Sequence, residues 1–214
     1  MIKRSPDCII NLSFEGRFMS KKEMAERVMG NLCIAVNKLQ RCRDFSMLMP
    51  EVRVNIVYAL PGAKSFREVA AIDGRITVVN GYPHASGLPG WGVSDHMARL
   101  VIEARKNRPQ FNAGINFKCD DGIIAVVKKY AREKKLLFGS IDRTTEPEEA
   151  SKVDGNSTPW KIKHMVARYG RVPDIFYEGD GWGKEPLFMT LGSDALSVVN
   201  IAIGLARLYA REKT

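Results

Sequence analysis

The stretch that decides the fold is NIVYALPGAKSFREVAAIDGRITVVNGYPHASGLPGWGVSDHMAR, which runs from residue 55 to residue 99. Its apolar residues alternate up to Leu60, which predicts a strand from about Glu51. We expect a short helix over 66–72, a second strand over 75–80 and a loop over 81–93 that is rich in glycine and proline. That loop is too long to be a simple connection, and long loops of this kind often bind ligands.

The same stretch places glycine turns beside cationic side chains. Glycine lets the backbone approach a ligand closely, and a helix start at Ser94 would offer unpaired N–H groups to an anion. Lys64, Arg75, His96 and Arg99 add positive charge or hydrogen-bond donors nearby. Together these features indicate a site for a phosphorylated small molecule, although either glycine loop taken alone is more often a plain turn.

Outward from this stretch, helices and strands alternate along the chain. Ser20 and Glu23 form a capping box for the first helix, and Thr158-Pro159 is a typical helix start. We expect helices over 20–40, 94–107, 121–134, 158–170 and 194–213, and strands over 112–117, 136–141 and 173–177, with a weak strand over 8–14 and a mobile acidic segment over 144–156. This alternation predicts a layered α/β fold with a largely parallel or mixed sheet.

Length and charge narrow the class of protein. A chain of 214 residues fits one domain, which we expect over 20–214 after an extension over 1–19. The net charge of +9 favours acidic partners. No Lys/Arg run exceeds two residues and no nucleic-acid reader motif occurs, so we expect no specific nucleic-acid partner. The chain has neither a signal peptide nor a long apolar run, which predicts a cytoplasmic protein without membrane contact.

Cysteine and histidine spacing argues against two further classes. The four cysteines form no Cys-x-x-Cys pair, so we expect reduced, mostly structural thiols. The three histidines form neither His-x-His nor His-x-x-x-His. A zinc site would therefore need ligands that converge from distant segments.

Several irregular strings occur together in a known order. They are Asn-Ile-Val-Tyr-Ala-Leu-Pro-Gly-Ala-Lys over 55–64, Val-Ala-Ala over 69–71, Gly-Arg-Ile over 74–76, Ser-Asp-His over 94–96 with Ala-Arg at 98–99, and Gly-Lys-Glu-Pro over 183–186. From about Glu26 to the C-terminus the chain resembles the ThiN-type thiamine-phosphate synthase family, which is largely archaeal. The resemblance implies a three-layer α/β/α sandwich with a mixed sheet, similar to the class II aldolase fold.

In that family the domain commonly follows a hydroxymethylpyrimidine phosphate kinase domain, or a helix-turn-helix in thiamine-phosphate-sensing repressors. Only about 20 residues precede the first helix here, so we expect a free-standing domain. A metal-dependent aldolase is a third reading, but its His-x-His ligand pair is absent.

The resemblance implies an enzyme that joins hydroxymethylpyrimidine pyrophosphate to hydroxyethylthiazole phosphate and releases pyrophosphate. It also implies Mg²⁺ as a cofactor, phosphorylated pyrimidine and thiazole substrates as partners, and catalytic roles for Arg75 and His96. The alternative is a sensor that binds thiamine phosphate without chemistry. Retention of both residues favours the enzyme.

The resemblance implies that further residues bind substrate. It leaves a homo-oligomer open. The substrate-binding set is Asn55, Gly62, Ala63, Lys64, Ser94, Asp95, Arg99, Lys184 and Glu185. The metal ligands are left open, with Asp95 and Glu185 as candidates, and Trp91 or Trp182 would either stack on a ring or anchor a loop. We expect Lys64, Arg75, His96 and Arg99 to converge on one cavity, with the 179–186 loop at its rim or completing it across a subunit contact.

Overall fold

The computed structural model describes residues 19–147, 157–179 and 185–213. Its helices, including short 3-10 helices labelled η, are α1 (Lys21–Gln40), η1 (Arg43–Leu48), η2 (Phe66–Glu68), α2 (His96–Asn107), α3 (Asp121–Glu133), η3 (Arg143–Thr145), α5 (Ser157–Tyr169) and α6 (Ala195–Lys213). Its strands are β1 (Ile56–Ala59), β2 (Val69–Ile72), β3 (Ile76–Val79), β4 (Tyr82–Ala85), β5 (Pro89–Trp91), β6 (Ala113–Lys118), β7 (Phe138–Ile141), β8 (Ile175–Glu178) and β9 (Leu187–Gly192). No helix in these ranges is long and apolar enough to span a bilayer.

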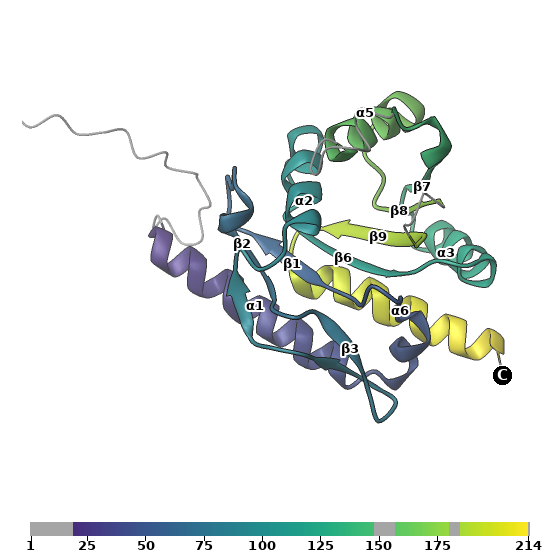
Figure 1. Ribbon diagram of the computed structural model, residues 1–214, viewed down its shortest axis with the longest axis horizontal. Helices are drawn as coiled ribbons and strands as arrows, with labels where there is room; N and C mark the ends of the chain where they lie inside the picture. The colour runs from purple at the N-terminus through teal and green to yellow at the C-terminus, as the bar shows by residue number, and fades with distance from the viewer. Residues whose placement is uncertain (1–18, 148–156, 180–184, 214) are drawn as a thin grey trace, which may run out of the picture.

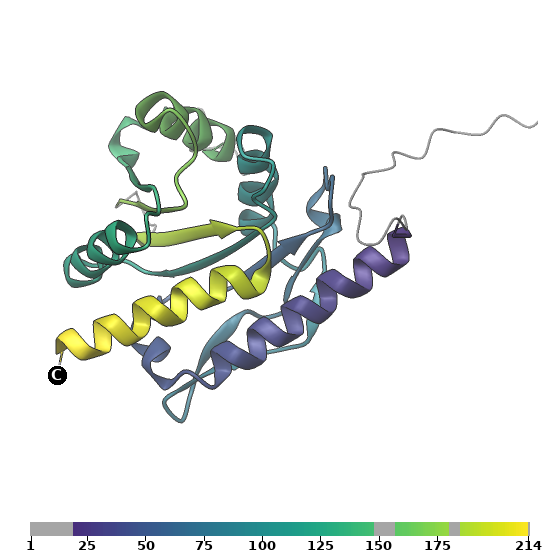
Figure 2. The same cartoon turned by 180° about the vertical axis from the view of Figure 1, so that it is seen from behind.

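A seven-stranded mixed sheet forms the middle layer, in the order β5-β2-β1-β6-β9-β8-β7. Only β7 and β8 pair in parallel, and the other neighbours are antiparallel. Helices α1 and α6 cover one face, while α2 and α5 cover the other (Figure 1). The view from behind shows α1 and α6 side by side across their face (Figure 2). The predicted α/β/α sandwich with a mixed sheet is confirmed.

Crossover handedness explains how α3 and α5 reach opposite faces. Strands β6, β7 and β8 point the same way, so both β6–α3–β7 and β7–α5–β8 are parallel crossovers. Such crossovers are almost always right-handed. Because the first runs outward along the sheet and the second runs back, α3 packs beside α6 and α5 lies on the α2 face.

Packing differs along one face of β6. A Cβ on Gly114 would lie 3.1 Å from Leu191 Cδ2 and 3.2 Å from both Met97 and Val101, so α2 sits directly on this glycine. Asn116 lies two residues further along and therefore on the same face. The opposite face of the sheet is aromatic, with Phe117 and Phe188 stacked at 5.1 Å between ring centroids. The α2 face is thus apolar at one end of β6 and polar at the other.

The structure corrects four local predictions. The predicted helix over 66–72 is one turn of η2 followed by buried β2, because the capping box of Ser65 and Glu68 starts a helix that ends at once. The predicted loop over 81–93 contains β4 and β5. Strand β9, in the interior of the sheet, was not predicted. Asp95 rather than Ser94 holds the N-cap position of α2, and its side chain makes no cap hydrogen bond.

Other predictions agree with the structure or lie outside it. The capping box of Ser20 and Glu23 is present at the start of α1. Asp120 caps α3 and α5 begins at Ser157, within one residue of its predicted start. The weak strand over 8–14 and most of the segment over 144–156 lie outside the described residues.

Gly114→Ala should lower the free energy of unfolding by about 1–3 kcal/mol, because the new methyl group would overpack the contact between β6 and α2. Gly30→Ala is the matched control. A Cβ there has no atom within 4 Å, and alanine favours the middle of a helix by about 0.5–1 kcal/mol. Urea denaturation of both variants checks this, and equal effects of the two would contradict the packing described for α2.

Candidate functional site

The predicted site residues fall at two opposite edges of the sheet. We call edge A the one where β2, β6, β7 and β8 end and β1 and β9 begin, and edge B the other. Arg75 follows the end of β2 at edge A, and Glu185 precedes β9 at the same edge. Helix α2 begins beside η2, which precedes β2 at edge B. Within one chain, Arg75 and His96 therefore do not meet.

At edge A, two arginines each donate a hydrogen bond to a backbone carbonyl oxygen in the loop that carries the other. Arg75 has a left-handed φ of 68° and donates from Nη1 to the carbonyl oxygen of Val52 at 2.5 Å. Arg53 has a φ of 66° and donates from Nη1 to the carbonyl oxygen of Gly74 at 3.4 Å. Left-handed backbone at a non-glycine residue is strained and often marks a functional site. These two contacts place both exposed guanidinium groups at edge A.

Glu185 closes the same loop from the other side. Its carboxylate oxygens accept the backbone N–H groups of Glu51 at 3.0 Å and Val52 at 3.1 Å. This connects the start of β9 to the turn that carries Arg53. Lys184, which was predicted to bind substrate beside Glu185, lies outside the described residues.

Asn55 and Asn116 continue the sheet at edge A, beyond the first residue of β1. The Asn55 amide exchanges two hydrogen bonds with the backbone of Ile72, at 3.1 and 3.2 Å. Asn116 Oδ1 accepts the Asn55 backbone N–H at 2.8 Å, and Asn116 Nδ2 donates to the Arg53 carbonyl oxygen at 3.0 Å. These contacts give the buried Asn55 a structural role that positions both Arg53 and the end of β2. Its role as a substrate contact stays a prediction.

At edge B, backbone N–H groups of the predicted phosphate-binding loop already have hydrogen-bond partners within the protein. Gly62 has the left-handed φ of 74° that a glycine turn needs. The backbone N–H groups of Lys64 and Ser65, however, both donate to Glu68 Oε2, at 2.9 and 3.3 Å. Ala63 donates to the Leu60 carbonyl oxygen. The Lys64 side chain is exposed, so its ammonium group rather than the loop backbone is what this turn offers an anion.

The start of α2 lies beside this loop. His96 is the first residue of the helix and is exposed, with Ser94 just before it. Asp95 turns its carboxylate toward Arg99 Nε, at 2.7 and 2.8 Å, instead of capping the helix. The Arg99 guanidinium also lies 6.0 Å from the ring centroid of Phe66. Edge B thus carries Lys64, His96 and Arg99 on neighbouring segments, without Arg75. Their convergence on one cavity stays a prediction.

The residues at either edge do not fit a preformed metal centre. Asp95 is held by Arg99, and Glu185 is held by two backbone N–H groups. The described part of the chain contains no group of three His, Cys, Asp or Glu side chains placed to hold a metal ion. Protein sites commonly hold Mg²⁺ through one or two carboxylates together with substrate phosphates. Neither carboxylate is therefore free to bind a metal ion in this arrangement.

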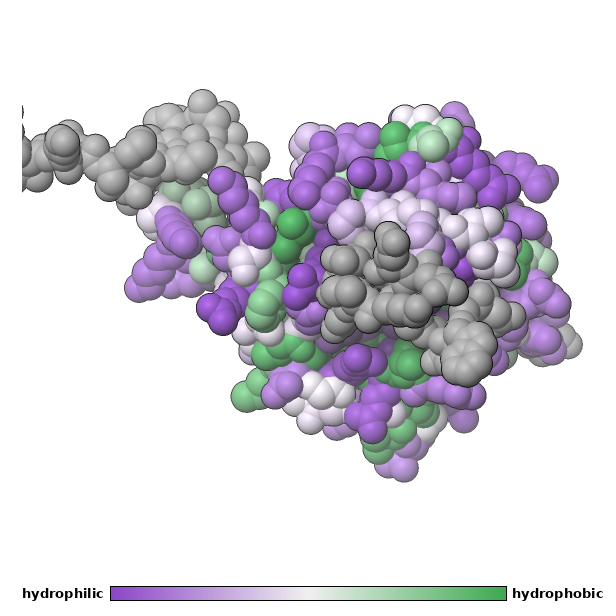
Figure 3. Space-filling view, turned by 45° about the horizontal axis from the view of Figure 1, so that its top comes forward, coloured by the Kyte–Doolittle hydropathy of each residue, from purple (hydrophilic) through white to green (hydrophobic). Residues whose placement is uncertain are grey.

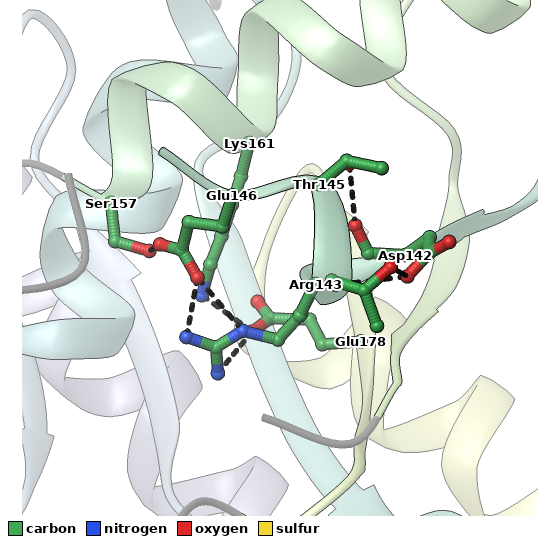
Figure 4. A network of polar contacts seen from close by, with 8 residues as sticks. Asp142, Arg143, Thr145, Glu146, Ser157, Lys161 and Glu178 are labelled. Carbon is green, nitrogen blue, oxygen red and sulfur yellow. Dashed lines mark hydrogen bonds and ion pairs between the residues drawn. The ribbon is translucent and has the colours of Figure 1, made fainter. Parts of the chain in front are cut away.

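Sequence reasoning missed a buried group at edge A. The ion-pair cluster consists of Arg143, Glu146, Lys161 and Glu178, which join the end of β7, the start of α5 and the end of β8 (Figure 4). Arg143 donates to Glu146 Oε2 from Nε at 3.1 Å and from Nη2 at 2.8 Å. Lys161 Nζ donates to Glu178 Oε2, and Arg143 Nη1 lies 3.7 Å from the same oxygen. Ser157 Oγ donates to Glu146 Oε1.

One sequence signal could have revealed the cluster. The buried residues of α5 are Thr158, Lys161, Ile162 and Met165, which form the apolar stripe of an amphipathic helix. A lysine within such a stripe has to find a buried partner, because an unpaired buried charge is costly. The partner, Glu178, ends the next strand along the chain.

Electrostatics in the cluster follow from burial and pairing. Burial lowers the pKa of Lys161, and the carboxylate of Glu178 only partly offsets this effect. Burial acts to raise the pKa of Glu146, but hydrogen bonds from Ser157 and Arg143 outweigh it, so this pKa is lowered overall. The outer surface on the α2 and α5 side is mostly hydrophilic (Figure 3). The cluster is therefore a buried charged group on the side of the sheet whose visible outer surface is mostly hydrophilic.

The lowered pKa of Glu146 makes its contribution to stability depend on pH. That contribution is fully present above the ordinary pKa of 4.5 and is lost as pH falls through the lower folded-state pKa. Glu146→Gln should therefore cost about 1.5–3 kcal/mol of unfolding free energy at pH 7, and progressively less below about pH 4. Urea denaturation at both values measures the difference. The control is Glu26→Gln, at an exposed pair with Lys22, which should change the free energy of unfolding little. A loss of unfolding free energy in Glu146→Gln that stays the same at acidic pH would contradict the pairing of Glu146.

Comparison with known proteins places the chain in a family. Residues 31–203 match the family described as "Thiamine-phosphate synthase ThiN". The chain is 34% identical over 179 residues to "Thiamine-phosphate synthase ThiN" of Methanothermobacter thermautotrophicus, covering 84% of this chain and 92% of that protein. It is 36% identical over 186 residues to "Bifunctional thiamine biosynthesis protein ThiDN" of Methanocaldococcus jannaschii, covering 86% of this chain and 42% of that protein.

A solved structure gives the same result. The crystal structure of the C-terminal domain of a phosphomethylpyrimidine kinase superposes with a TM-score of 0.78 at 32% sequence identity. The match covers 85% of this chain and 99% of that domain. The shared fold, together with sequence similarity over most of the chain, shows that this protein belongs to the ThiN family of thiamine-phosphate synthases.

Proposed function

We infer that this chain is a thiamine-phosphate synthase. The observation that carries the inference is the family match over residues 31–203, which spans both Arg75 and His96. The reaction breaks the bond between the pyrimidine methylene carbon and the pyrophosphate oxygen, and forms a bond from that carbon to the thiazole nitrogen. The bonding electrons leave with pyrophosphate. Since the thiazole nitrogen is already a nucleophile, the protein's work is to position the substrates and stabilise charge.

Arg75 suits the leaving group. Its position at the ends of several strands is a common place for ligand sites in α/β sheets. Arg75 donates to the Val52 carbonyl oxygen, and Arg53 donates to the carbonyl oxygen of Gly74 just before it. A guanidinium group has five N–H donors, which match phosphate oxygens in pairs. We assign His96, with Lys64 and Arg99, to binding phosphate groups at edge B. Any Mg²⁺ that accompanies pyrophosphate would be held mainly by the phosphate oxygens.

The wild-type protein, supplied with both substrates and Mg²⁺, should form thiamine phosphate, which is measured by fluorescence after oxidation. Arg75→Ala and His96→Ala should each lower turnover about 10²- to 10³-fold, the usual effect of losing one preorganised donor in a transition state. Exposed Arg171 and His84 provide matched controls, and alanine at either should leave turnover nearly unchanged. A wild-type protein that binds thiamine phosphate tightly but makes none would instead support a sensor.

Because Arg75 and His96 lie at opposite edges, we propose that each complete site takes Arg75 from one chain and His96 from another. Mixing inactive Arg75→Ala with inactive His96→Ala under conditions of subunit exchange should then restore activity. In a two-fold dimer with two shared sites, random mixing gives about a quarter of wild-type turnover, because half the dimers are mixed and each holds one intact site. Turnover that stays at the level of the separate variants, while mass spectrometry detects mixed dimers, would contradict a shared site.

A further inference from the structure

The ion-pair cluster leaves one carboxylate oxygen without a partner. Both cations of the cluster approach Glu178 through Oε2, Lys161 by a hydrogen bond and Arg143 at 3.7 Å. Glu178 Oε1 is buried and accepts no hydrogen bond from the described residues. The whole residue is only 4% exposed. A buried acceptor without a donor is costly, so such a group calls for an explanation, such as a bound water, an ion or a role in catalysis.

The location of Glu178 favours a ligand. It is the last residue of β8, and it stands beside the end of the parallel strand β7 at edge A. In open α/β sheets, ligands bind outside the carboxyl ends of such strands. Register also places Glu178 on the same sheet face as Asn116, because Asn116 pairs with Met189 and Met189 pairs with Phe176, two residues before Glu178. This face becomes polar toward the edge that carries Arg75.

The chemistry of the substrates then selects which group meets this oxygen. A carboxylate oxygen accepts hydrogen bonds and repels phosphate, so the facing group has to be an uncharged or cationic donor. The hydroxyl of the thiazole substrate is already esterified with phosphate, and its ring carries no N–H. The pyrimidine substrate carries an exocyclic amino group with two N–H donors. A metal ion would need further ligands, and the described chain offers no such group of side chains here.

We propose that Glu178 Oε1 accepts a hydrogen bond from the exocyclic amine of the aminopyrimidine substrate, with Lys161 and Arg143 holding the carboxylate in place through Oε2. This inference rests on the proposed synthase function and adds a specificity residue to it. As the methylene carbon loses pyrophosphate, positive charge spreads through the ring to the amine. The hydrogen bond to a carboxylate strengthens as that charge grows, so Glu178 also favours the transition state.

The test compares the natural pyrimidine pyrophosphate with an analogue in which hydrogen replaces the exocyclic amine. The ratio of kcat/KM for the amino substrate to kcat/KM for the analogue should fall about 10- to 100-fold from wild type to Glu178→Gln, the effect of one hydrogen bond to a charged group. The electron-donating amine itself favours the amino substrate in every variant. Glu178→Gln should lower kcat/KM for the amino substrate and leave the analogue nearly unchanged, so the preference shrinks. KM for the thiazole phosphate should not change.

Glu146→Gln is the matched control within the ion-pair cluster, because both carboxylate oxygens of Glu146 already have partners in the protein. It should keep the preference for the amino substrate, even where it lowers stability. The double variant Lys161→Met with Glu178→Met removes both charges together, which proteins often tolerate. This variant should fold, as judged by circular dichroism, and show the same fall in the ratio of kcat/KM values as Glu178→Gln.

Two results would overturn the proposal and leave the cluster with a structural role only. One is that Glu178→Gln lowers kcat/KM equally for the amino substrate and the analogue. The other is that Glu146→Gln reduces the preference as much as Glu178→Gln does. Calorimetric binding of both pyrimidines to wild type and to Glu178→Gln separates this from failure of the synthase assignment. A wild-type protein without turnover that still binds the amino compound more tightly, through Glu178, would refute the synthase and retain the recognition site. Absence of any preference in binding or turnover would refute the recognition site.

Discussion

The hydrogen bonds between Asn55, Asn116 and the backbone around them are the constraint on which the structure of edge A depends. Strand β1 has only four residues, yet its neighbours have to stay aligned beyond its first residue. The Asn55 amide reproduces two ladder bonds to Ile72, and Asn116 ties the Arg53 carbonyl into the same array. Without these amides, buried backbone groups at this edge would lose their partners, and the loop that carries Arg53 would lose its anchor.

The other contacts at edge A depend on the turn that precedes Asn55. The fixed turn before Asn55 supplies the Val52 carbonyl oxygen for Arg75 and the two backbone N–H groups for Glu185. Further along the sheet, the ion-pair cluster attaches α5 to the end of β8. Charge therefore lies at the ends of several strands along edge A, with the two arginines beside β1 and β2 and the ion-pair cluster beside β7 and β8. Edge B adds a second cationic group around Lys64 and α2.

Local signals predicted much of the fold and pointed to the segments that carry the candidate site residues. The capping box at Ser20, the strand at β1 and helices α1, α2, α3, α5 and α6 were predicted because each depends mainly on residues near in sequence. Strand β9 reads LFMTLG, which is apolar on both faces and lacks the alternation that marks a half-buried strand. The motifs around Arg75 and His96 were visible, but their separation was not, because strand order sets it. The ion-pair cluster contains one local pair, Arg143 and Glu146, but tertiary packing brings Arg143 and Lys161 to Glu178.

A crystal structure of the protein with the pyrimidine pyrophosphate and an unreactive thiazole phosphate analogue would test this account most directly. We predict the pyrophosphate against Arg75 at edge A, the pyrimidine amine within about 3.2 Å of Glu178 Oε1, and His96 of a second chain reaching the same site. A pyrimidine bound at edge B among Lys64, His96 and Arg99 of one chain, with Glu178 sealed from it, would contradict the account.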